Sequence, residues 1–325
     1  MTKIHMAFYL RYRPQTLDDL LGQEAVKKTL LAAYQSGKLS HAYLLVGPRG
    51  TGKTSTARIS AKMVNCEKLT DYRLPSTAEV GRQKTEDNHI PCNKCDSCIS
   101  ITNGSNLDLI EMDAASNSSV EDIRSLREKI KLAPTSSQKK VYIIDEVHML
   151  STSAFNALLK TLEEPPPHTL FILATTEAQK IPATILSRAQ RLDFKLASQE
   201  DLKAGLKKIC QAEKLDISKE ALSEVARLAE GSFRDGQKLL DQLASLGNKI
   251  TVEDILQLLR STKFETVVNL LGLIAEKNCK QALVVLNKEV ESGSNAKSLA
   301  LSILASLRHL MLVKMAWVNS WLRLN

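Results

Sequence analysis

A glycine-rich stretch with the spacing G-x-x-x-x-G-K-T constrains this chain more than any other feature of its sequence. The stretch follows the apolar run 42–46 and precedes the helix-forming residues 55–64. In this context the glycines let successive backbone N–H groups converge on a phosphate at the positive end of a helix. Lys53 is expected to reach the β- and γ-phosphates of ATP, and the Thr54 hydroxyl to coordinate Mg²⁺. The residues expected to contact the nucleotide here are Gly47, Pro48, Arg49, Gly50, Thr51, Gly52, Lys53 and Thr54.

A second nucleotide motif ends the apolar run 141–144, which is typical of a buried parallel strand. Asp145 and Glu146 follow that run directly. Asp145 is expected to bind the nucleotide's Mg²⁺, usually through water, and Glu146 to orient or deprotonate the attacking water. Two carboxylates at a strand end could instead serve a turn and a helix cap, but the phosphate loop earlier in the chain favours the catalytic interpretation.

Strand and helix patterns alternate over the first part of the chain, which predicts a parallel sheet covered by helices on both faces. Thr175 and Thr176 end one predicted strand, where strand ends face the ligand. Beyond Lys195 the strand signals stop, and capping serines predict helices to the end of the chain. The domains expected are an α/β nucleotide-binding domain over 1–195, a helical lid over 196–246 and a further helical domain over 247–325.

Cysteines cluster in a stretch, 67–104, that has neither a helical nor a strand period. An irregular excursion of this length inside a compact domain needs something to hold it together. Three cysteines at the spacing C-x2-C-x2-C, together with Cys66, would supply the thiolates of a closed structural zinc site. His89 is the alternative fourth ligand, because it continues the same spacing towards Cys92. This arrangement fits metal binding in a reducing compartment better than disulfides.

The composition narrows the classes of partner. Lys and Arg number 44 against 36 Asp and Glu, and the net charge of +8 permits contact with nucleic acid. Aromatic residues make up only 4%, so DNA should be contacted through phosphates rather than through stacked bases. No apolar core of signal-peptide length precedes Arg11, and charged residues interrupt the apolar stretch 298–318. A cytoplasmic protein without a membrane partner is therefore expected.

Taken in order, these motifs resemble those of the AAA+ ATPases, and more closely those of the gamma/tau subunits of the bacterial DNA polymerase III clamp loader. The resemblance covers the chain to about residue 250 and is less specific beyond it. It implies an AAA+ P-loop sheet domain with a zinc-binding module at about 66–98, a helical lid, and a collar-type oligomerisation domain that is short at Asn325 and lacks a tau-type extension. The stretches that carry it are Tyr12–Thr16, Gly47–Thr54, Cys92–Cys98, Asp145–Leu150, Leu158–Pro166, Ala174–Thr176 and Ile185–Arg188.

The resemblance also implies roles that spacing alone does not show. Thr175 is similar to sensor 1, a hydroxyl that contacts the γ-phosphate and positions water. Arg188 resembles the arginine finger presented to the nucleotide of a neighbouring subunit, although Ala189 replaces the cysteine that usually follows it. Arg234 resembles sensor 2, which joins the lid to the bound phosphates. The zinc ligands implied by the family, after a longer first interval than usual, are Cys66, Cys92, Cys95 and Cys98.

The function implied is ATP-driven loading of a sliding clamp onto primed DNA, within the polymerase III holoenzyme, a DNA-directed DNA polymerase. The partners implied are delta, delta prime and further gamma/tau subunits in a hetero-oligomeric ring, the sliding clamp, and primer–template DNA. DNA phosphates are expected near residues 117–119, Lys160 and Lys180. Two alternatives are an AAA+ DNA translocase or branch-migration motor, and a clamp-loader subunit that binds partners without hydrolysing ATP. The cofactors expected are ATP, Mg²⁺ and structural Zn²⁺.

Overall fold

The computed structural model describes two compact units, Met1–Lys249 and Ile250–Asn325. His89, the alternative metal ligand, and residues 118–119, part of the expected DNA contact, lie outside the described residues. The candidate site discussed below belongs entirely to the first unit. The residues whose placement is described are 6–70, 91–117, 120–260, 264–291, 299–304, 306–308, 310–311 and 314.

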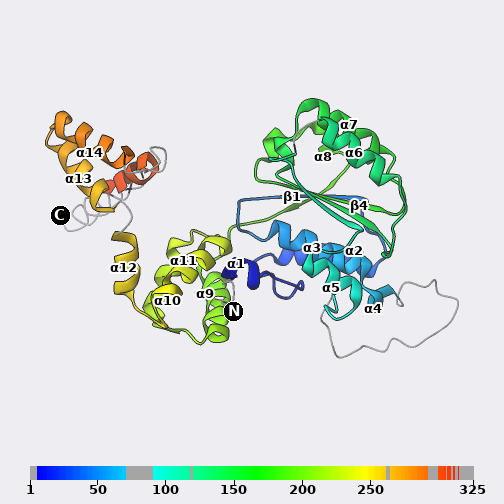
Figure 1. Ribbon diagram of the computed structural model, residues 1–325, viewed down its shortest axis with the longest axis horizontal. Coiled ribbons are helices and arrows are strands. Elements are labelled where there is room, and N and C mark those ends of the chain that lie inside the picture. Colours follow the sequence, from blue (N-terminus) through cyan, green and yellow to red (C-terminus); the bar gives the residue numbers. More distant parts are fainter. Residues whose placement is uncertain are drawn as a thin grey trace, which may run out of the picture. The chain divides into compact units, whose positions relative to one another are not determined.

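A five-stranded sheet forms the centre of the first unit (Figure 1). All of its neighbouring strands pair in parallel, in the order β2-β3-β4-β1-β5, which confirms the predicted fold class. The order places the end of β4 between the loop that follows β1 and the acidic pair that follows β3. The strands are β1 (Ala42–Val46), β2 (Leu109–Asp113), β3 (Lys140–Asp145), β4 (Thr169–Thr175) and β5 (Gln190–Asp193).

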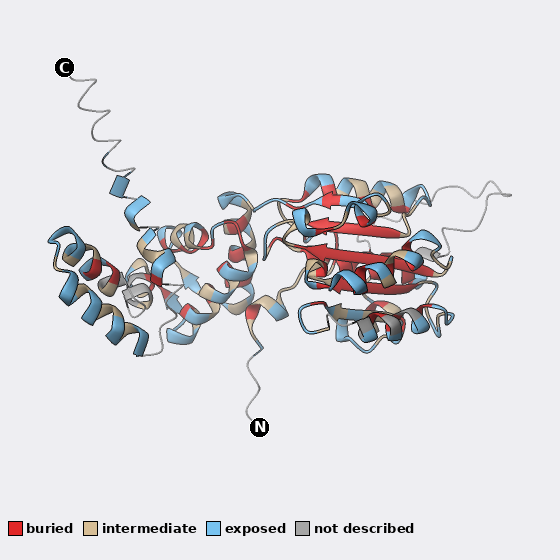
Figure 2. Ribbon diagram, turned by 90° about the horizontal axis from the view of Figure 1, so that it is seen from above, coloured by how far each residue is buried: buried red, intermediate tan, exposed pale blue. Residues whose placement is uncertain are grey.

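Helices cover both faces of this sheet, and the central strands β1, β3 and β4 are buried between them, whereas the edge strands β2 and β5 are more exposed (Figures 1 and 2). Alternate residues of β1 divide between two cores: Tyr43 and Leu45 pack with α2 and α3, whereas Leu44 packs with α6, α7 and α8 on the opposite face. Burial on both faces explains why the strands read as continuous apolar runs. The covering helices are α2 (Glu24–Gln35), α3 (Lys53–Asn65), α6 (Val120–Ile130), α7 (Thr152–Glu163) and α8 (Ala183–Leu186).

Three short helices occur in the described segments that precede and follow the phosphate-loop helix α3. Helix α1 (Phe8–Arg11) lies near the N-terminus and packs against α11 (Phe233–Leu246) of the lid. Helix α4 (Glu67–Thr70) follows α3, and α5 (Asp96–Asn103) begins within the cysteine run and packs against α3. The described ends of the cysteine-rich stretch, at α4 and α5, therefore pack against the same helix that follows the phosphate loop.

Three helices after β5 form the lid. A serine precedes each helix, and its hydroxyl accepts a hydrogen bond from the backbone N–H three residues further on. These serines are Ser198 for α9, Ser218 for α10 and Ser232 for α11. These are the capping serines that predict the helix starts from sequence. The lid elements are α9 (Gln199–Glu213), α10 (Lys219–Leu228) and α11 (Phe233–Leu246), with short strands β6 (Asp216–Ile217) and β7 (Lys249–Ile250).

The second unit is helical, and many of its described apolar side chains are exposed. Val267, Leu270 and Leu299 form its small buried core. Leu283 and Leu304 are examples of the side chains that remain open to solvent. No helix among the described residues has both the length and the apolar character to cross a bilayer. Its helices include α12 (Val252–Arg260), α13 (Phe264–Ala275) and α14 (Cys279–Glu291).

Candidate nucleotide-binding site and metal centre

A cleft of about 630 Å³ lies at the carboxyl edge of the sheet, lined by the phosphate loop, the N-terminal segment and the lid. Its volume lies in the range of ligand pockets in proteins. The sequence predicts the loop and the acidic pair here, but it does not predict the wall formed by residues 9–14, because that wall depends on the packing of the N-terminal helix α1 against α11 of the lid. Lining residues include Tyr9, Tyr12, Arg13, Arg49, Gly50, Lys53, Thr54, Asp145, Glu146, Lys208 and Arg234.

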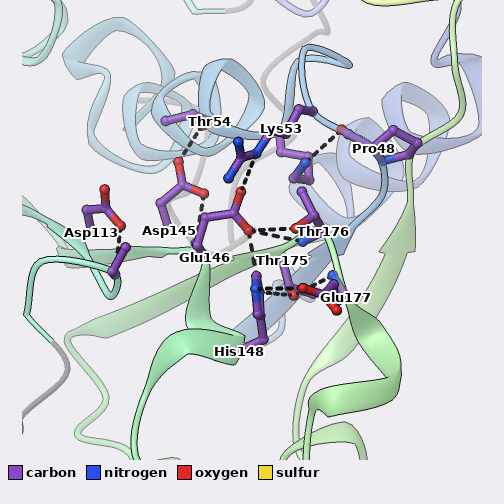
Figure 3. Close-up of polar contacts among 12 residues, drawn as sticks. Pro48, Lys53, Thr54, Asp113, Asp145, Glu146, His148, Thr175, Thr176 and Glu177 are labelled. Atoms are coloured by element: carbon purple, nitrogen blue, oxygen red, sulfur yellow. Dashed lines mark hydrogen bonds and ion pairs between the residues drawn. The ribbon is translucent and has the colours of Figure 1, made fainter. Parts of the chain in front are cut away.

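The phosphate loop is closed by the side chain of Lys53. Its Nζ atom donates to the carbonyl oxygens of Gly47 at 2.7 Å and Pro48 at 2.8 Å (Figure 3). The residue is 7% exposed, and this burial lowers the pKa of Lys53, whereas the nearby carboxylates of Glu146 and Asp145 raise it. The ammonium is thus held at the loop by two neutral carbonyl oxygens. A phosphate oxygen carries negative charge, so it would be a stronger acceptor and would take their place.

The lid contacts the phosphate loop directly. The backbone N–H of Phe233, the first residue of α11, donates to the Gly50 carbonyl at 3.1 Å. Gly50 has φ +74°, and a Cβ atom there would lie 2.0 Å from the hydroxyl oxygen of Ser232. Glycine is therefore required by both backbone conformation and close approach. The next residue of α11, Arg234, places its guanidinium over the Tyr9 ring, 5.0 Å from the centroid.

The acidic pair lies beside the start of the phosphate-loop helix. Thr54 donates its hydroxyl to Asp145 Oδ2 at 2.8 Å, and the Glu146 backbone N–H donates to the other carboxylate oxygen at 2.9 Å. The two residues expected to bind Mg²⁺ are thus in direct contact. The Glu146 backbone is left-handed, with φ +46°, a conformation that non-glycine residues adopt mainly where the surrounding structure imposes it.

The Glu146 carboxylate is held at the end of β4. Its Oε2 atom accepts hydrogen bonds from the Thr176 backbone N–H at 3.2 Å and from the Thr176 hydroxyl at 3.0 Å. Arg49 lies 3.5 Å from the other carboxylate oxygen. The side chain therefore has a fixed position next to Thr175, as Figure 3 shows. The sequence gives Thr176 no role beyond ending its strand.

A buried histidine joins this carboxylate to the sensor-like threonine. His148 lies in the short 3-10 helix η2 (Val147–Met149), and its side chain is 5% exposed. Its Nδ1 atom lies 3.0 Å from the Thr175 hydroxyl and 3.4 Å from Glu146 Oε2, and its Nε2 atom lies 3.3 Å from Glu177. Glu177 in turn pairs with the exposed Lys180 at 2.9 Å. In the sequence, the only indication that His148 belongs to the site is its position two residues after the acidic pair, within the stretch Asp145–Leu150.

Replacing His148 should reduce turnover more than nucleotide affinity, because the ring positions Thr175 and Glu146 without facing the phosphate loop. For His148→Leu we expect kcat for ATP to fall about 10- to 100-fold, the scale of small misplacements in a site. His148→Asn keeps a polar atom close to the backbone and should retain more activity. Steady-state kinetics with a separate nucleotide-binding titration measure both effects. His168→Leu, which alters a histidine bonded to Ile130, is the matched control; an unchanged kcat in His148→Leu would remove the positioning role.

Arg188, like Gly47, Pro48 and the fully buried Thr175, is a predicted nucleotide-site residue that does not line this cleft. It follows α8, donates to the Thr184 carbonyl at 2.7 Å and pairs with Glu163 at 2.7 Å. It is not among the residues that line the described cleft. The position is compatible with an arginine presented to another protomer. Of the predicted DNA contacts, Lys160 is exposed and Asn117 donates its side-chain amide to the Asp113 carbonyl at 3.0 Å.

The four predicted cysteines converge on one point. Their sulfur atoms all lie within 4.8 Å of one another. A tetrahedral site with Zn–S near 2.3 Å places its sulfurs about 3.8 Å apart, so the spacing fits zinc. The convergence favours Cys66 at the end of α3 as the fourth ligand. The set is Cys66, Cys92, Cys95 and Cys98.

The thiols of this cluster act on one another electrostatically. A hydrogen bond from Cys98 lowers the pKa of the Cys66 thiol to about 5, and the same contact raises the pKa of Cys98. One thiolate in the group thus makes ionisation of its neighbour harder. A divalent metal removes that conflict, because it binds sulfur in the deprotonated form.

The sheet order, the phosphate loop after β1, the acidic pair after β3, the hydroxyl-bearing end of β4 and the helical lid together define an AAA+ P-loop protein. Comparison with known proteins narrows the class. Residues 22–198 match the family described as DNA polymerase III, delta subunit. Residues 201–249 match the family described as DNA polymerase III clamp loader subunit, ATPase lid domain.

Curated relatives identify the family more closely. The chain is 38% identical to DNA polymerase III subunit gamma of Buchnera aphidicola over 305 residues, which cover 94% of the chain and 79% of the relative. It is 46% identical to subunit tau of Bacillus subtilis over 96% of the chain and 53% of that relative. It is 39% identical to subunit tau of Escherichia coli over 94% of the chain and 45% of that relative. The chain belongs to the DNA polymerase III gamma/tau family. It spans about half the length of the tau relatives.

Solved structures agree on the fold. A variant of Thermotoga maritima RuvB aligns with a TM-score of 0.56 at 18% identity, over 89% of this chain and 88% of that one. RuvB described as a Holliday junction branch migration motor aligns with a TM-score of 0.55, also at 18% identity and with the same coverage. At this level of identity the likeness concerns the fold alone.

Proposed function

We propose that this chain is an ATP-hydrolysing clamp-loader subunit, which uses ATP binding and hydrolysis to open a sliding clamp and load it on primed DNA within DNA polymerase III. The observation that carries the proposal is the contact of Thr54 with Asp145, with Glu146 next to it, beside an intact phosphate loop. A subunit that only binds partners has no need of this complete set. The relatives quoted above, all named as DNA polymerase III subunits, supply the clamp-loading context.

The site residues divide the chemistry among them. Backbone N–H groups of the phosphate loop and the Lys53 ammonium bind the β- and γ-phosphates. Thr54 and Asp145 would hold Mg²⁺, which supplies charge neutralisation on the phosphates when bound. Glu146 orients the attacking water and accepts its proton, and the Thr175 hydroxyl fixes the water's position near the γ-phosphate.

Cations from separate elements crowd one side of the cleft and would favour a polyanionic ligand. Burial lowers the pKa of Arg13, and repulsion from Arg58 and Arg234 lowers it further, although the carboxylates of Glu111 and Asp145 oppose this. A triphosphate would relieve the repulsion between Arg13 and Arg234, which come from the N-terminal segment and the lid. Bound ATP would therefore stabilise the closed arrangement of the lid, the sensor 2 role proposed for Arg234.

Assembly would complete the site. Arg188, remote from its own cleft, would act on the nucleotide of a neighbouring subunit as an arginine finger. The exposed apolar side chains of the second unit suit packing against delta, delta prime or further gamma/tau copies in a ring. Zinc at the four cysteines would be structural, because protein ligands fill a tetrahedral site. The compartment proposed is the bacterial cytoplasm.

ATPase assays on the assembled loader test this function. With the companion subunits present, the hydrolysis rate should rise when the clamp and primed DNA are both added, because DNA completes the arrangement that triggers hydrolysis. The logarithm of DNA affinity should fall with the logarithm of salt concentration, by about 0.9 for each duplex phosphate contacted. Rates that do not respond to clamp and primed DNA would exclude clamp loading. Strand displacement or branch migration by the chain would favour the translocase alternative instead.

A further inference from the structure

Lys62 is a charged residue buried inside the first unit. It lies on α3, one turn before the helix ends at Asn65, and is only 1% exposed. Its Nζ atom donates to Gln15 Oε1 at 2.5 Å and to Asn93 Oδ1 at 2.8 Å. Both acceptors are neutral amides. An ammonium taken out of water needs a compensating negative charge, because hydrogen bonds to neutral groups replace only part of its hydration.

The segments around this ammonium also carry the cysteines of the cluster. Asn93, which accepts one of the hydrogen bonds, is the residue directly after Cys92. Helix α3 itself leads into Cys66, and α5, which carries Cys98, packs against α3. Burial lowers the pKa of Lys62, and the negative groups that oppose this are the sulfurs of Cys98 and Cys92 together with the Asp19 carboxylate. Two of these three groups belong to the cluster.

The charge of a four-cysteine metal centre explains the position of the lysine. Four thiolates around one divalent cation carry a net charge of −2, and this excess lies inside the protein. The Asp19 carboxylate, in contrast, already accepts hydrogen bonds from the Thr16 backbone N–H at 3.1 Å and from its hydroxyl at 2.8 Å. The cluster is therefore the larger and less compensated negative charge available to Lys62.

We propose that Lys62 is the charge-balancing cation of the four-cysteine metal centre. Its ammonium offsets part of the excess negative charge of the metal–thiolate cluster and thereby raises the affinity of the cysteines for zinc. The inference rests on the proposed metal centre, but not on clamp loading or ATP hydrolysis. The proposal gives the phosphate-loop helix a second role. Helix α3 begins at Lys53, which is proposed to bind phosphate, and carries Lys62, proposed to balance the metal centre, near its other end.

Zinc competition on the full chain tests this role. Wild type, Lys62→Met and Lys62→Arg, each loaded with one zinc ion, are titrated with a chromophoric chelator. Lys62→Met keeps the length of the side chain but removes its charge, and should raise the Kd for zinc about 10- to 100-fold, the usual scale for residues that support metal ligands. Lys62→Arg should stay close to wild type. Lys140→Met, which removes another buried lysine, at 7% exposure and on β3, should leave the affinity unchanged.

Thermal unfolding separates charge balance from packing. With zinc bound, Lys62→Met should lower Tm; in the reduced, metal-free protein the same change should lower Tm less or not at all, because the buried ammonium has lost its counter-charge. Equal destabilisation with and without zinc, or a zinc affinity of Lys62→Met equal to that of wild type, would overturn the proposal. A wild-type chain that binds no zinc would overturn it together with the metal centre. Neither readout depends on ATPase activity, so failure of clamp loading would be seen separately.

Discussion

Glu146→Gln is expected to stop ATP hydrolysis while ATP binding continues. The amide has the size of the carboxylate and can still accept a hydrogen bond from Thr176, so the end of β4 should keep its structure. It cannot accept a proton from the attacking water. Loss of a general base costs about 10²- to 10⁴-fold in rate, and we expect kcat to fall on this scale.

Single-turnover hydrolysis measured beside fluorescent nucleotide binding separates the two properties. Glu111→Gln is the matched control, because Glu111 lies on β2 and pairs with Arg58, 2.5 Å away, rather than facing Thr176. That variant should hydrolyse ATP at close to the wild-type rate. A Glu146→Gln protein with undiminished hydrolysis would mean that another group accepts the proton, and the proposed role of Glu146 would have to be withdrawn.

Arg188→Ala should impair hydrolysis at a neighbouring subunit and leave the variant's own nucleotide affinity unchanged. An arginine finger contributes about 10³- to 10⁵-fold to kcat in enzymes that use one. In this structure the guanidinium is partly exposed and pairs with Glu163. Exposed ion pairs are worth about 0–1 kcal/mol, so exchanging this carboxylate for a phosphate should cost little.

Mixed assemblies provide the measurement. Subunits with Arg188→Ala are combined with subunits that carry Lys53→Ala, so that each active site can be assigned to the protomer that supplies its phosphate loop. Arg191→Ala, on the adjacent strand β5 and paired with Asp193 at 2.7 Å, is the control and should retain activity. Full hydrolysis in assemblies that lack every Arg188 side chain would contradict a finger role, as would loss of nucleotide binding by the isolated Arg188→Ala chain.

The parts of the fold that could be predicted are those with a local cause. Continuous apolar runs predicted the buried strands, since both faces of the sheet are covered, and serines such as Ser198 and Ser232 predicted helix starts because their hydroxyls bond to N–H groups three residues away. The phosphate loop carries its own backbone requirements in its glycines. These signals need no knowledge of distant residues.

The parts that could not be predicted depend on contacts between distant segments. The wall of the cleft at Tyr9 and Arg13 exists because α1 packs on the lid, and nothing within residues 9–13 records that packing. The buried partners of His148 and Lys62 are equally remote in sequence. The choice between Cys66 and His89 stayed open for the same reason: spacing alone does not show where a chain returns, whereas the converging sulfurs favour Cys66.

The hydrogen bond between Phe233 and Gly50 has a mechanical consequence. Because α11 starts on the phosphate loop and packs with α9 and α10, a movement of that loop would be passed to all three helices. A small displacement of the loop when the terminal phosphate departs would swing the far ends of these helices through a larger arc. The position of the lid would then report directly on the state of the phosphate loop.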